Sequence, residues 1–231
     1  MTTITRTWQL DMWKGNFGKE YTERNLLSAA EADREYEKGF GIKKTDLYSY
    51  FLPPQLLSAG RVLEVGCNIG NSLRNLQRVK PGLSFYGVEP MAYAVAIARK
   101  LNPDMVFLHG TAFALPFQRG NFDLVMTNGV LIHIHPSDLP VALAEIYRCT
   151  CRYIFFHEYF AESKQEVIYR GHSGLLWKMN YQESFQKQFP DLECMRVHYL
   201  HYPDPATGKE LTDQVCLLGK RPAKVVRGET Q

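Results

Sequence analysis

Residues 62–70 (VLEVGCNIG) constrain the fold of this chain more than any other segment, because a short apolar run ends at the first of two glycines. The apolar run predicts a buried strand, and residues 71–76 after the second glycine have helical spacing. Glycine is favoured where the backbone needs a positive φ or where a ligand comes close, since a Cβ would clash. This order of strand, glycine turn and helix predicts an open α/β sheet that binds a nucleotide-like ligand at its carboxyl edge.

A second signal lies at residues 85–90 (FYGVEP), where Glu89 ends the next predicted strand. An acidic side chain at this point can accept hydrogen bonds from both hydroxyls of a ribose. The glycine turn has Asn68 where a dinucleotide motif has its middle glycine, and Glu64 precedes the turn. This acid suits a cationic amino group better than a pyrophosphate. The pattern resembles the first motif of class I S-adenosylmethionine-dependent methyltransferases, which implies S-adenosylmethionine as the cofactor.

Short predicted strands and helices alternate after the glycine turn, an order that favours a parallel sheet with helices on both faces. Further strands are predicted at 105–109, 122–128 and 152–157, and helices at 90–101 and about 137–148. The last strands, 194–202 and 213–218, are joined by a link too short for a crossover helix, so they must pair antiparallel. We therefore predict an α/β, Rossmann-like class I methyltransferase fold, with a seven-stranded, mostly parallel sheet and a C-terminal antiparallel hairpin.

The segments outside the sheet are expected to cover the ligand site. We predict an N-terminal helical lid or cap at residues 1–59, a cofactor-binding methyltransferase core at 60–220 and a flexible tail at 221–231. An insert at about 158–190 follows the fifth strand and is far longer than an ordinary connection of about six residues. We expect this insert to cover the site of the methyl acceptor.

Composition excludes several classes of protein. The chain of 231 residues has 27 basic and 24 acidic side chains, so its formal net charge is +3 and nucleic acid is not expected as a partner. No apolar stretch reaches the ~18–20 residues that span a bilayer, and the N-terminus lacks the order of a secretory signal. The five cysteines form neither a disulfide framework nor a zinc-ligand pattern. We expect a cytoplasmic protein with a small-molecule substrate, no membrane partner and no metal; a homodimer is left open.

Rarer segments narrow the resemblance from a superfamily to a family. Residues 13–25 (WKGNFGKEYTERN) are an unusual opening, and they combine with residues 129–134 (GVLIHI), 157–159 (HEY) and 169–172 (YRGH). Together with the glycine turn, these segments look like those of the pseudaminic acid biosynthesis-associated methylases, over about residues 8–218. The family name implies association with a pathway and leaves the acceptor open.

The superfamily resemblance implies a set of cofactor contacts along these motifs. We expect the methionine portion at the glycine turn, the ribose at the end of the second strand and the adenine after the third. The expected cofactor-binding residues are Glu64, Gly66, Cys67, Asn68, Gly70, Glu89, Pro90, Thr111, Ala112, Phe113 and Asn128. Thr111 stands where the superfamily commonly has an aspartate that binds the adenine amino group. Its hydroxyl, or the backbone of Ala112 and Phe113, is therefore expected to recognise adenine.

The candidate acceptor residues come from segments on either side of the glycine turn. If the acceptor is a hydroxyl, His133 or Glu158 is the candidate catalytic base. The expected substrate-binding residues are Tyr21, Arg24, His133, Tyr159, Arg170, His172 and Lys178. The alternatives are a packing role for the histidine and simple exposure for the charged side chains. Trp13, Phe17 and Tyr21 have a spacing of four, which predicts one helix face that is either core or a lid near the sulfonium.

These inferences predict an S-adenosylmethionine-dependent methyltransferase that moves a methyl group to O or N of a small, anionic metabolite resembling a sugar, an amino acid or a natural product. A nicotinamide-dependent oxidoreductase would use the same strand, turn and acid. A non-catalytic S-adenosylmethionine-binding protein is a second alternative, since no single residue is indispensable to the chemistry. An RNA or protein methyltransferase is less favoured, because the charge is near neutral and the acceptor motif of such enzymes is missing after the fourth strand.

Overall fold

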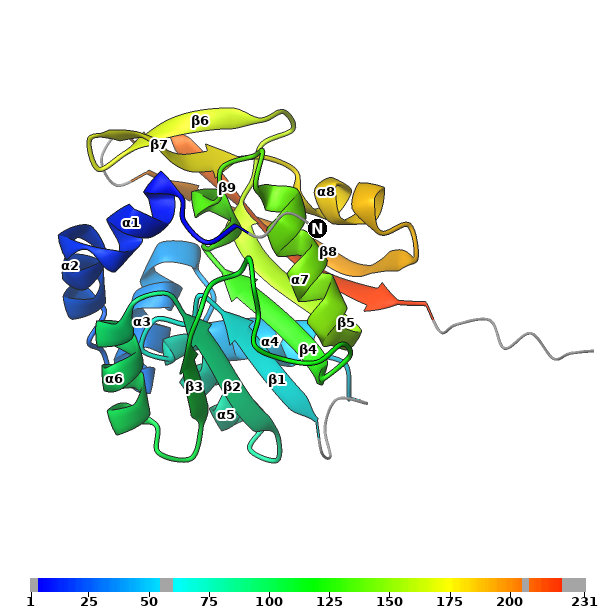
Figure 1. The fold of residues 1–231 in the computed structure, drawn as a ribbon. Helices are drawn as coiled ribbons and strands as arrows, with labels where there is room; N and C mark the ends of the chain where they lie inside the picture. Colours follow the sequence, from blue (N-terminus) through cyan, green and yellow to red (C-terminus); the bar gives the residue numbers. More distant parts are fainter. Residues whose placement is uncertain (1–3, 55–59, 205–207, 222–231) are drawn as a thin grey trace, which may run out of the picture.

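The main sheet of the computed structural model, which describes residues 4–54, 60–204 and 208–221, has seven strands (Figure 1). They lie in the order β3-β2-β1-β4-β5-β9-β8. The first five are parallel, and β9 pairs antiparallel with both β5 and β8. Their bounds are β1 (Arg61–Val65), β2 (Ser84–Glu89), β3 (Val106–His109), β4 (Phe122–Asn128), β5 (Thr150–Tyr159), β8 (Leu192–Pro203) and β9 (Glu210–Lys220). The predicted sheet and its C-terminal hairpin are confirmed, with hairpin strands longer than predicted.

Helices cover both faces of the sheet. On one face, α7 (Leu139–Cys149) packs over β4 and β5, and α8 (Tyr181–Gln188) packs against β8 and β9. On the other face lie α4 (Lys44–Phe51), α5 (Asn71–Val79) and α6 (Ala92–Leu101). Parallel strands buried on both faces read as continuous apolar runs, which is why β1 could be recognised from the sequence.

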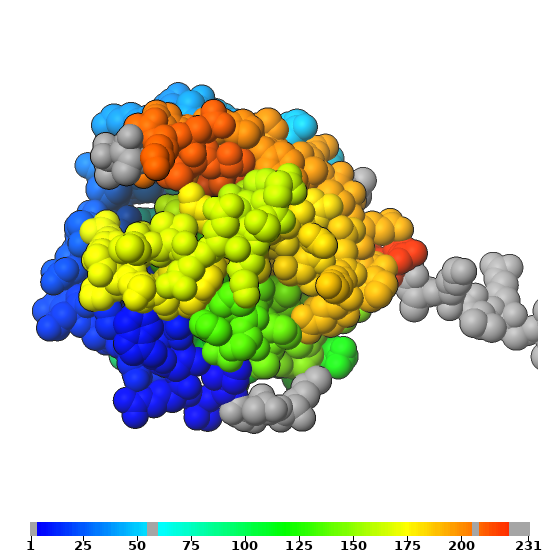
Figure 2. Space-filling view, turned by 90° about the horizontal axis from the view of Figure 1, so that it is seen from above, coloured from blue at the N-terminus to red at the C-terminus, as the bar shows by residue number. Residues whose placement is uncertain are grey.

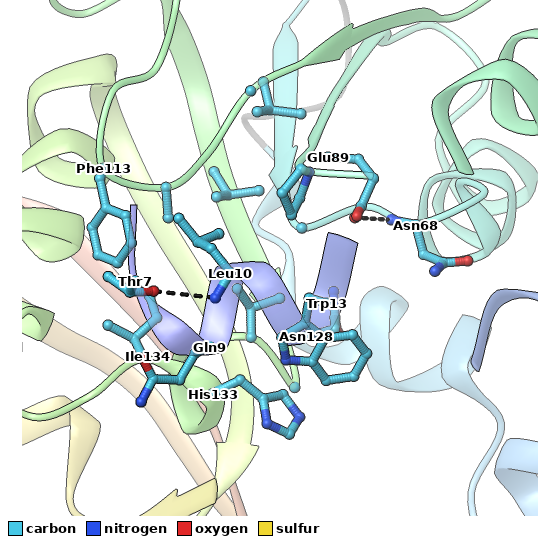
Figure 3. Close-up of a pocket in the computed structure, with 18 of the residues that line it drawn as sticks. Thr7, Gln9, Leu10, Trp13, Asn68, Glu89, Phe113, Asn128, His133 and Ile134 are labelled. Atoms are coloured by element: carbon cyan, nitrogen blue, oxygen red, sulfur yellow. Dashed lines mark hydrogen bonds between the residues drawn. The ribbon is translucent and has the colours of Figure 1, made fainter. Parts of the chain in front are cut away.

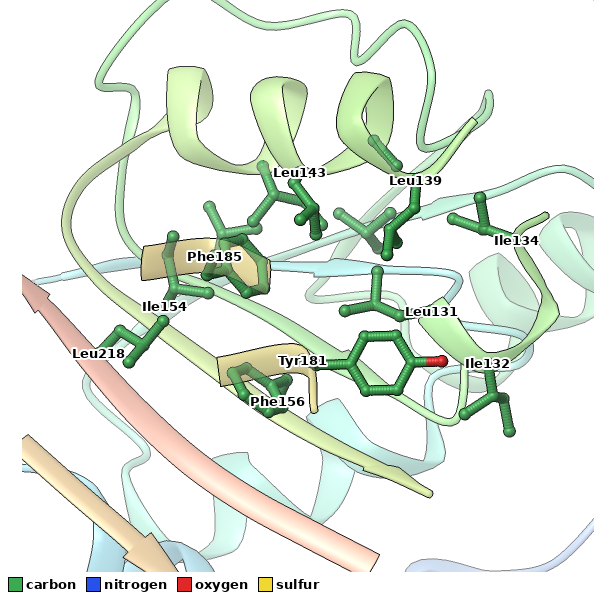
Figure 4. Packing of buried hydrophobic residues seen from close by; sticks show 14 of the residues in the cluster. Leu131, Ile132, Ile134, Leu139, Leu143, Ile154, Phe156, Tyr181, Phe185 and Leu218 are labelled. Atoms are coloured by element: carbon green, nitrogen blue, oxygen red, sulfur yellow. The ribbon is translucent and has the colours of Figure 1, made fainter. Parts of the chain in front are cut away.

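The larger apolar cluster lies on the α7 face of the sheet (Figure 4). Leu139 and Leu143 of α7 point toward Phe185 of α8 and toward Phe156 of β5. Leu143 is 1% exposed and Phe185 is fully buried. The start of α7 and the end of β5 lie at the carboxyl edge of the sheet, where a ligand is expected. This packing therefore fixes the position of the segments that carry the site.

The N-terminal segment forms α1 (Trp8–Lys14), α2 (Asn16–Arg24) and α3 (Ala29–Phe40) before α4. The prediction of one continuous helix through residues 13–21 is wrong, because the chain leaves helical geometry at Gly15, which ends α1 and caps α2. Trp13 and Phe17 therefore belong to different helices. Their rings are still in contact, with centroids 5.1 Å apart, because the chain turns at Gly15 and α1 packs against α2.

The predicted insert contains a separate two-stranded sheet, β6 (Gln165–Tyr169) and β7 (His172–Lys178), followed by α8. This hairpin lies over the same end of the main sheet as α1 and α2 (Figure 1). Gln9 Nε2 donates a hydrogen bond to Gly174 O at 2.9 Å, which ties α1 to β7. The tail predicted at 221–231 lies outside the described residues from position 222 onward. Among the residues that the structure describes, no helix is both long and apolar enough to cross a bilayer.

Leu143→Ala tests the packing on the α7 face. Removing this buried side chain leaves a cavity, so we expect the free energy of unfolding to fall by about 2–5 kcal/mol. Ile168→Ala is the matched control, because Ile168 is 74% exposed on β6 and should change that free energy by less than about 0.5 kcal/mol. Urea unfolding followed by circular dichroism measures both, and equal effects would contradict this assignment of the core.

Candidate active site

The glycine turn after β1 brings the backbone close to its neighbours. Gly66 has φ +71° and Gly70 has φ +83°, values that a residue with a Cβ rarely adopts. A Cβ on Gly66 would lie 2.5 Å from Val130 Cγ2, and one on Gly70 would lie 2.9 Å from Phe107 Cζ. Both positions therefore require glycine, and α5 begins directly after them without a side-chain cap. Its first N–H groups stay available at the carboxyl edge of the sheet.

Glu89, the last residue of β2, holds this turn in place (Figure 3). Its carboxylate accepts a hydrogen bond from Asn68 N at 2.9 Å and another from Met91 N at 3.0 Å. Burial raises the pKa of Glu89 to about 7, although the two backbone bonds act in the opposite direction. The carboxylate is thus fixed in orientation and keeps lone pairs for a ligand.

Two adjoining cavities lie at this edge, with volumes of about 120 Å³ and 250 Å³. The first contains the end of β2 and the loop after β3, and α1 closes it (Figure 3). The second lies between the glycine turn and the helices α2, α3 and α4. Residues common to both are Tyr21, Gly66, Asn68 and Asn128. One ligand can therefore extend from one cavity into the other.

The second cavity has buried acceptor atoms without a donor. Glu64 Oε1 accepts a hydrogen bond from Asn128 Nδ2 at 3.0 Å, whereas Glu64 Oε2 and Asn128 Oδ1 are buried and make no hydrogen bond. Burial raises the pKa of Glu64 to about 7, and the nearby Lys44 opposes this change. Because unsatisfied buried acceptors cost free energy, this pair fits a ligand that brings N–H donors.

Lys44, at the start of α4, supplies the opposite charge. Its ammonium donates a hydrogen bond to Ser72 Oγ at 2.9 Å and lies 5.3 Å from the centre of the Tyr36 ring. Burial lowers the pKa of Lys44, while Glu64 acts in the opposite direction. The second cavity therefore fits a group with both an ammonium and a carboxylate. Sequence reasoning missed Lys44, because nothing in its local sequence distinguishes it from the other lysines.

Aromatic side chains cover the junction of the cavities. Trp13 contacts Tyr21 and His133 edge-on, with ring centroids 5.3 Å and 4.6 Å away. His133 Nδ1 lies 2.7 Å from Leu175 O, an arrangement that assigns the proton to Nδ1. Burial lowers the pKa of His133 to about 4, so its ring is neutral at pH 7. Trp13, Tyr21 and His133 all line the first cavity.

Glu158 does not reach either cavity. It is fully buried on the α7 face, where its carboxylate accepts hydrogen bonds from Val130 N at 3.1 Å and Ile132 N at 3.4 Å. Burial raises the pKa of Glu158 to about 7. These bonds fix the short helix η2 (Leu131–His133), so Glu158 positions the loop that carries His133.

The other predicted residues divide between the cavities and the surface. Lining the first cavity are Glu89, Pro90, Ala112 and Phe113, and lining the second are Glu64 and Cys67. Thr111 and Gly70 line neither; the Thr111 hydroxyl accepts a hydrogen bond from Phe113 N at 3.3 Å. Arg24, Arg170 and His172 are exposed, and Lys178 lies 5.6 Å from the centre of the Tyr159 ring, outside both cavities. Within the described residues, no group of His, Cys, Asp or Glu is suited to hold a metal ion.

Known proteins resemble this chain in sequence over one region and in fold over most of it. Residues 62–152 match a family model described as a methyltransferase domain. Magnesium protoporphyrin IX methyltransferase from Synechocystis, solved with bound S-adenosylmethionine, is 12% identical with a TM-score of 0.65, over 95% of this chain and 100% of that one. An S-adenosylmethionine-dependent methyltransferase from Methanosarcina mazei is 15% identical with a TM-score of 0.60, over 75% and 100% of the two chains.

A solved structure with another activity has a similar fold. The [4+2]-cyclase SpnF is 17% identical with a TM-score of 0.62, over 78% of this chain and 80% of that one. Curated protein sequences include none that matches this chain. At these identities the solved structures establish the fold, and the family match covers residues 62–152. The chain accordingly contains a methyltransferase domain within a Rossmann-like fold.

Proposed function

We propose that the protein transfers a methyl group from S-adenosylmethionine to an oxygen or nitrogen atom of a small, anionic metabolite. The observation that carries the cofactor part is the pair of opposite charges in the second cavity. Glu64 and Asn128 offer unsatisfied acceptors to the ammonium of the methionine portion, and Lys44 offers its ammonium to the carboxylate. Glu89 would then bind the ribose, and the wall of Ala112 and Phe113 the adenine.

The same charges disfavour a nicotinamide dinucleotide. Its pyrophosphate would lie beside the glycine turn, where the buried carboxylate of Glu64 would repel it. S-adenosylmethionine carries no phosphate, and its amino acid portion matches the acid and the lysine. The sequence alternative of an oxidoreductase is therefore the weaker proposal.

The enclosure of the cavities supports a small acceptor. In Figure 2 the hairpin β6–β7, in yellow, lies between the N-terminal helices, in blue, and the strands β8 and β9, in orange. A hollow opens where these three segments meet. Arg170 on the hairpin and Arg24 on α2 are exposed cations on the covering segments, which suits an anionic acceptor.

Methyl transfer needs little covalent chemistry from the protein. The sulfonium supplies an activated methyl group when the cofactor is bound. The residues of the site have to align the acceptor with this group and exclude water, and alignment alone can contribute about 7–11 kcal/mol to lowering the barrier. Trp13, Tyr21 and His133 would enclose the methyl group at the junction of the two cavities, where the acceptor meets it.

Lys44→Met tests the binding of the methionine carboxylate. Loss of a charge-assisted hydrogen bond of about 1.5–3 kcal/mol should weaken binding of S-adenosylhomocysteine by about 10- to 150-fold. Binding of 5′-methylthioadenosine, which lacks the amino acid portion, should not change. Lys100→Met on the exposed face of α6 is the control. Calorimetric titration measures the affinity of the wild type, Lys44→Met and Lys100→Met for each ligand. If Lys44→Met lost the same affinity for both ligands, the role of Lys44 would be contradicted.

The pH dependence of binding tests Glu64. Because the ligand ammonium prefers the ionised carboxylate, affinity for S-adenosylhomocysteine should fall as pH decreases through the Glu64 pKa of about 7. The Glu89 pKa is also about 7, and binding of 5′-methylthioadenosine reports its contribution separately. The difference in affinity between S-adenosylhomocysteine and 5′-methylthioadenosine should therefore shrink from pH 8 to pH 6, about one unit on each side of this pKa. In Glu64→Gln, this difference in affinity should no longer depend on pH. A difference that is constant with pH in the wild type would refute this assignment.

Transfer of a radiolabelled methyl group tests the proposed reaction. The wild-type protein is incubated with methyl-labelled S-adenosylmethionine and, separately, with N-acetylneuraminic acid, glucuronic acid, glycine and sarcosine. We expect label in at least one acceptor, with an equal amount of S-adenosylhomocysteine formed. Labelling of none of these acceptors, despite cofactor binding, would count against the proposed substrate class.

A further inference from the structure

A chain of hydrogen bonds joins the N-terminal helices to the interior of the sheet. Tyr36 Oη, on α3, lies 3.0 Å from His157 Nδ1, on β5. His157 Nε2 lies 2.7 Å from Asp213 Oδ2, on β9. His157 is 6% exposed and Asp213 is 2% exposed, so water has little access to either. The three side chains form a Tyr–His–Asp relay whose outer member is the phenol.

The chemistry of the partners fixes the direction of these hydrogen bonds. A carboxylate only accepts, so His157 Nε2 carries the proton that is shared with Asp213. His157 Nδ1 is then the unprotonated nitrogen and accepts from the Tyr36 hydroxyl. Tyr202 donates to the other oxygen of Asp213 at 2.6 Å, which holds the carboxylate in its orientation.

The phenol is the member of the relay that reaches the ligand site. Tyr36 lines the second cavity together with Tyr21 and Asn128, which also line the first cavity. His157 and Asp213 line neither cavity. A proton from a ligand in this chamber can therefore enter the relay through Tyr36.

The charged and titratable neighbours of the relay come from every element around it. Lys44 of α4 lies over the Tyr36 ring, Asp213 of β9 faces His157, and Tyr202 of β8 faces Asp213. The ammonium of Lys44 lies 5.3 Å from the ring centre. Burial, with the charge of Asp213, raises the pKa of Tyr36, so the phenol keeps its proton at rest and donates it to His157. Phe40 packs edge-on against the His157 ring and excludes water there.

His133 is less suited to receive a proton. Its Nδ1–H is donated to the carbonyl oxygen of Leu175, and no carboxylate is hydrogen-bonded to its ring. A positive charge on His133 would therefore be buried without a partner, which is costly. A positive charge on His157 would form 2.7 Å from the Asp213 carboxylate. Of these two histidines, His157 has the arrangement of a proton acceptor.

We propose that Tyr36, with His157 and Asp213 behind it, takes the proton that the acceptor loses during methyl transfer. This inference rests on the proposed function. The acceptor oxygen or nitrogen forms a bond to the methyl carbon with its lone pair, and the bond from that carbon to sulfur breaks, leaving its electron pair on sulfur. The acceptor proton passes to Tyr36 Oη as the Tyr36 proton passes to His157 Nδ1. After the product leaves, the proton returns from His157 Nδ1 through Tyr36 Oη to solvent in the second cavity. Tyr36 is the catalytic residue in this step, and His157 and Asp213 are positioning residues.

The protonation state of His157 tests the relay without any acceptor. Nitrogen-15 chemical shifts are measured in the full chain with S-adenosylhomocysteine bound. We expect the proton on Nε2 and none on Nδ1, as the hydrogen bonds with Asp213 and Tyr36 require. A proton on Nδ1, alone or together with one on Nε2, would overturn the proposal, because neither form can accept from Tyr36. This readout does not depend on which acceptor the enzyme uses.

Tyr36→Phe and Tyr199→Phe form a matched pair for the kinetic test. Each variant removes one hydrogen-bonded phenolic hydroxyl, that of Tyr36 beside His157 or that of Tyr199 beside Gln214, but only Tyr36 lines a cavity and belongs to the relay. With the labelled acceptor from the panel, Tyr36→Phe should lower kcat by about 10²- to 10⁴-fold, the range for general acid–base catalysis. Its affinity for S-adenosylhomocysteine should change less than about twofold. Tyr199→Phe should keep kcat within about threefold, whereas a role in stability alone predicts similar losses of kcat in both variants.

The rate of Tyr36→Phe separates the relay from the methyltransferase function. A Tyr36→Phe enzyme with the wild-type kcat would overturn the relay while leaving the methyltransferase function intact. If the wild type labels none of the four acceptors, the proposed substrate class fails. The nitrogen-15 chemical shifts of His157 then remain as the test of the relay.

Discussion

The carboxylate of Glu89 makes the interaction on which the rest of the site depends. It accepts hydrogen bonds from Asn68 N in the glycine turn and from Met91 N after β2, and so joins two loops of the carboxyl edge. Asn68 in turn donates from Nδ2 to Thr22 Oγ1 at 2.9 Å, which fixes α2 over the turn. The glycine turn, Glu89 and the N-terminal cover are thus one hydrogen-bonded unit. Loss of any member would move the others.

The N-terminal helices supply chemistry as well as cover. Lys44 completes the charges around the second cavity, and Tyr36 connects that cavity to His157. Trp13 lines the first cavity. An open α/β sheet places its ligand at the carboxyl ends of its strands, but the sheet alone offers little that is specific to one acceptor. In this protein the distinguishing groups come from segments that pack onto the edge.

Local sequence patterns were sufficient to predict the sheet and the cofactor edge. The glycine turn, Glu89 and the C-terminal hairpin depend on neighbours in sequence, so their structure could be inferred from spacing. Lys44 and the relay could not be predicted in this way, because Tyr36 and His157 are 121 positions apart and His157 and Asp213 are 56 apart. Only the folded chain brings them together.

The prediction of Glu158 as a base shows a second limit of sequence reasoning. The sequence placed residues 157–159 at the end of a strand but did not reveal which face each side chain occupies. Successive side chains of β5 alternate, so Glu158 lies on the α7 face and His157 lies on the α3 face. The imidazole that reaches the second cavity through Tyr36 is therefore the neighbour of the predicted residue.

The similar fold of a [4+2]-cyclase makes direct evidence for the cofactor essential, since one fold can serve different reactions. Calorimetric titration of the full chain with S-adenosylhomocysteine and, separately, with NAD⁺ gives that evidence most directly. The arrangement of Glu64, Lys44 and Glu89 predicts micromolar binding of S-adenosylhomocysteine and no measurable binding of NAD⁺. Binding of NAD⁺ without binding of S-adenosylhomocysteine would contradict the account of the site.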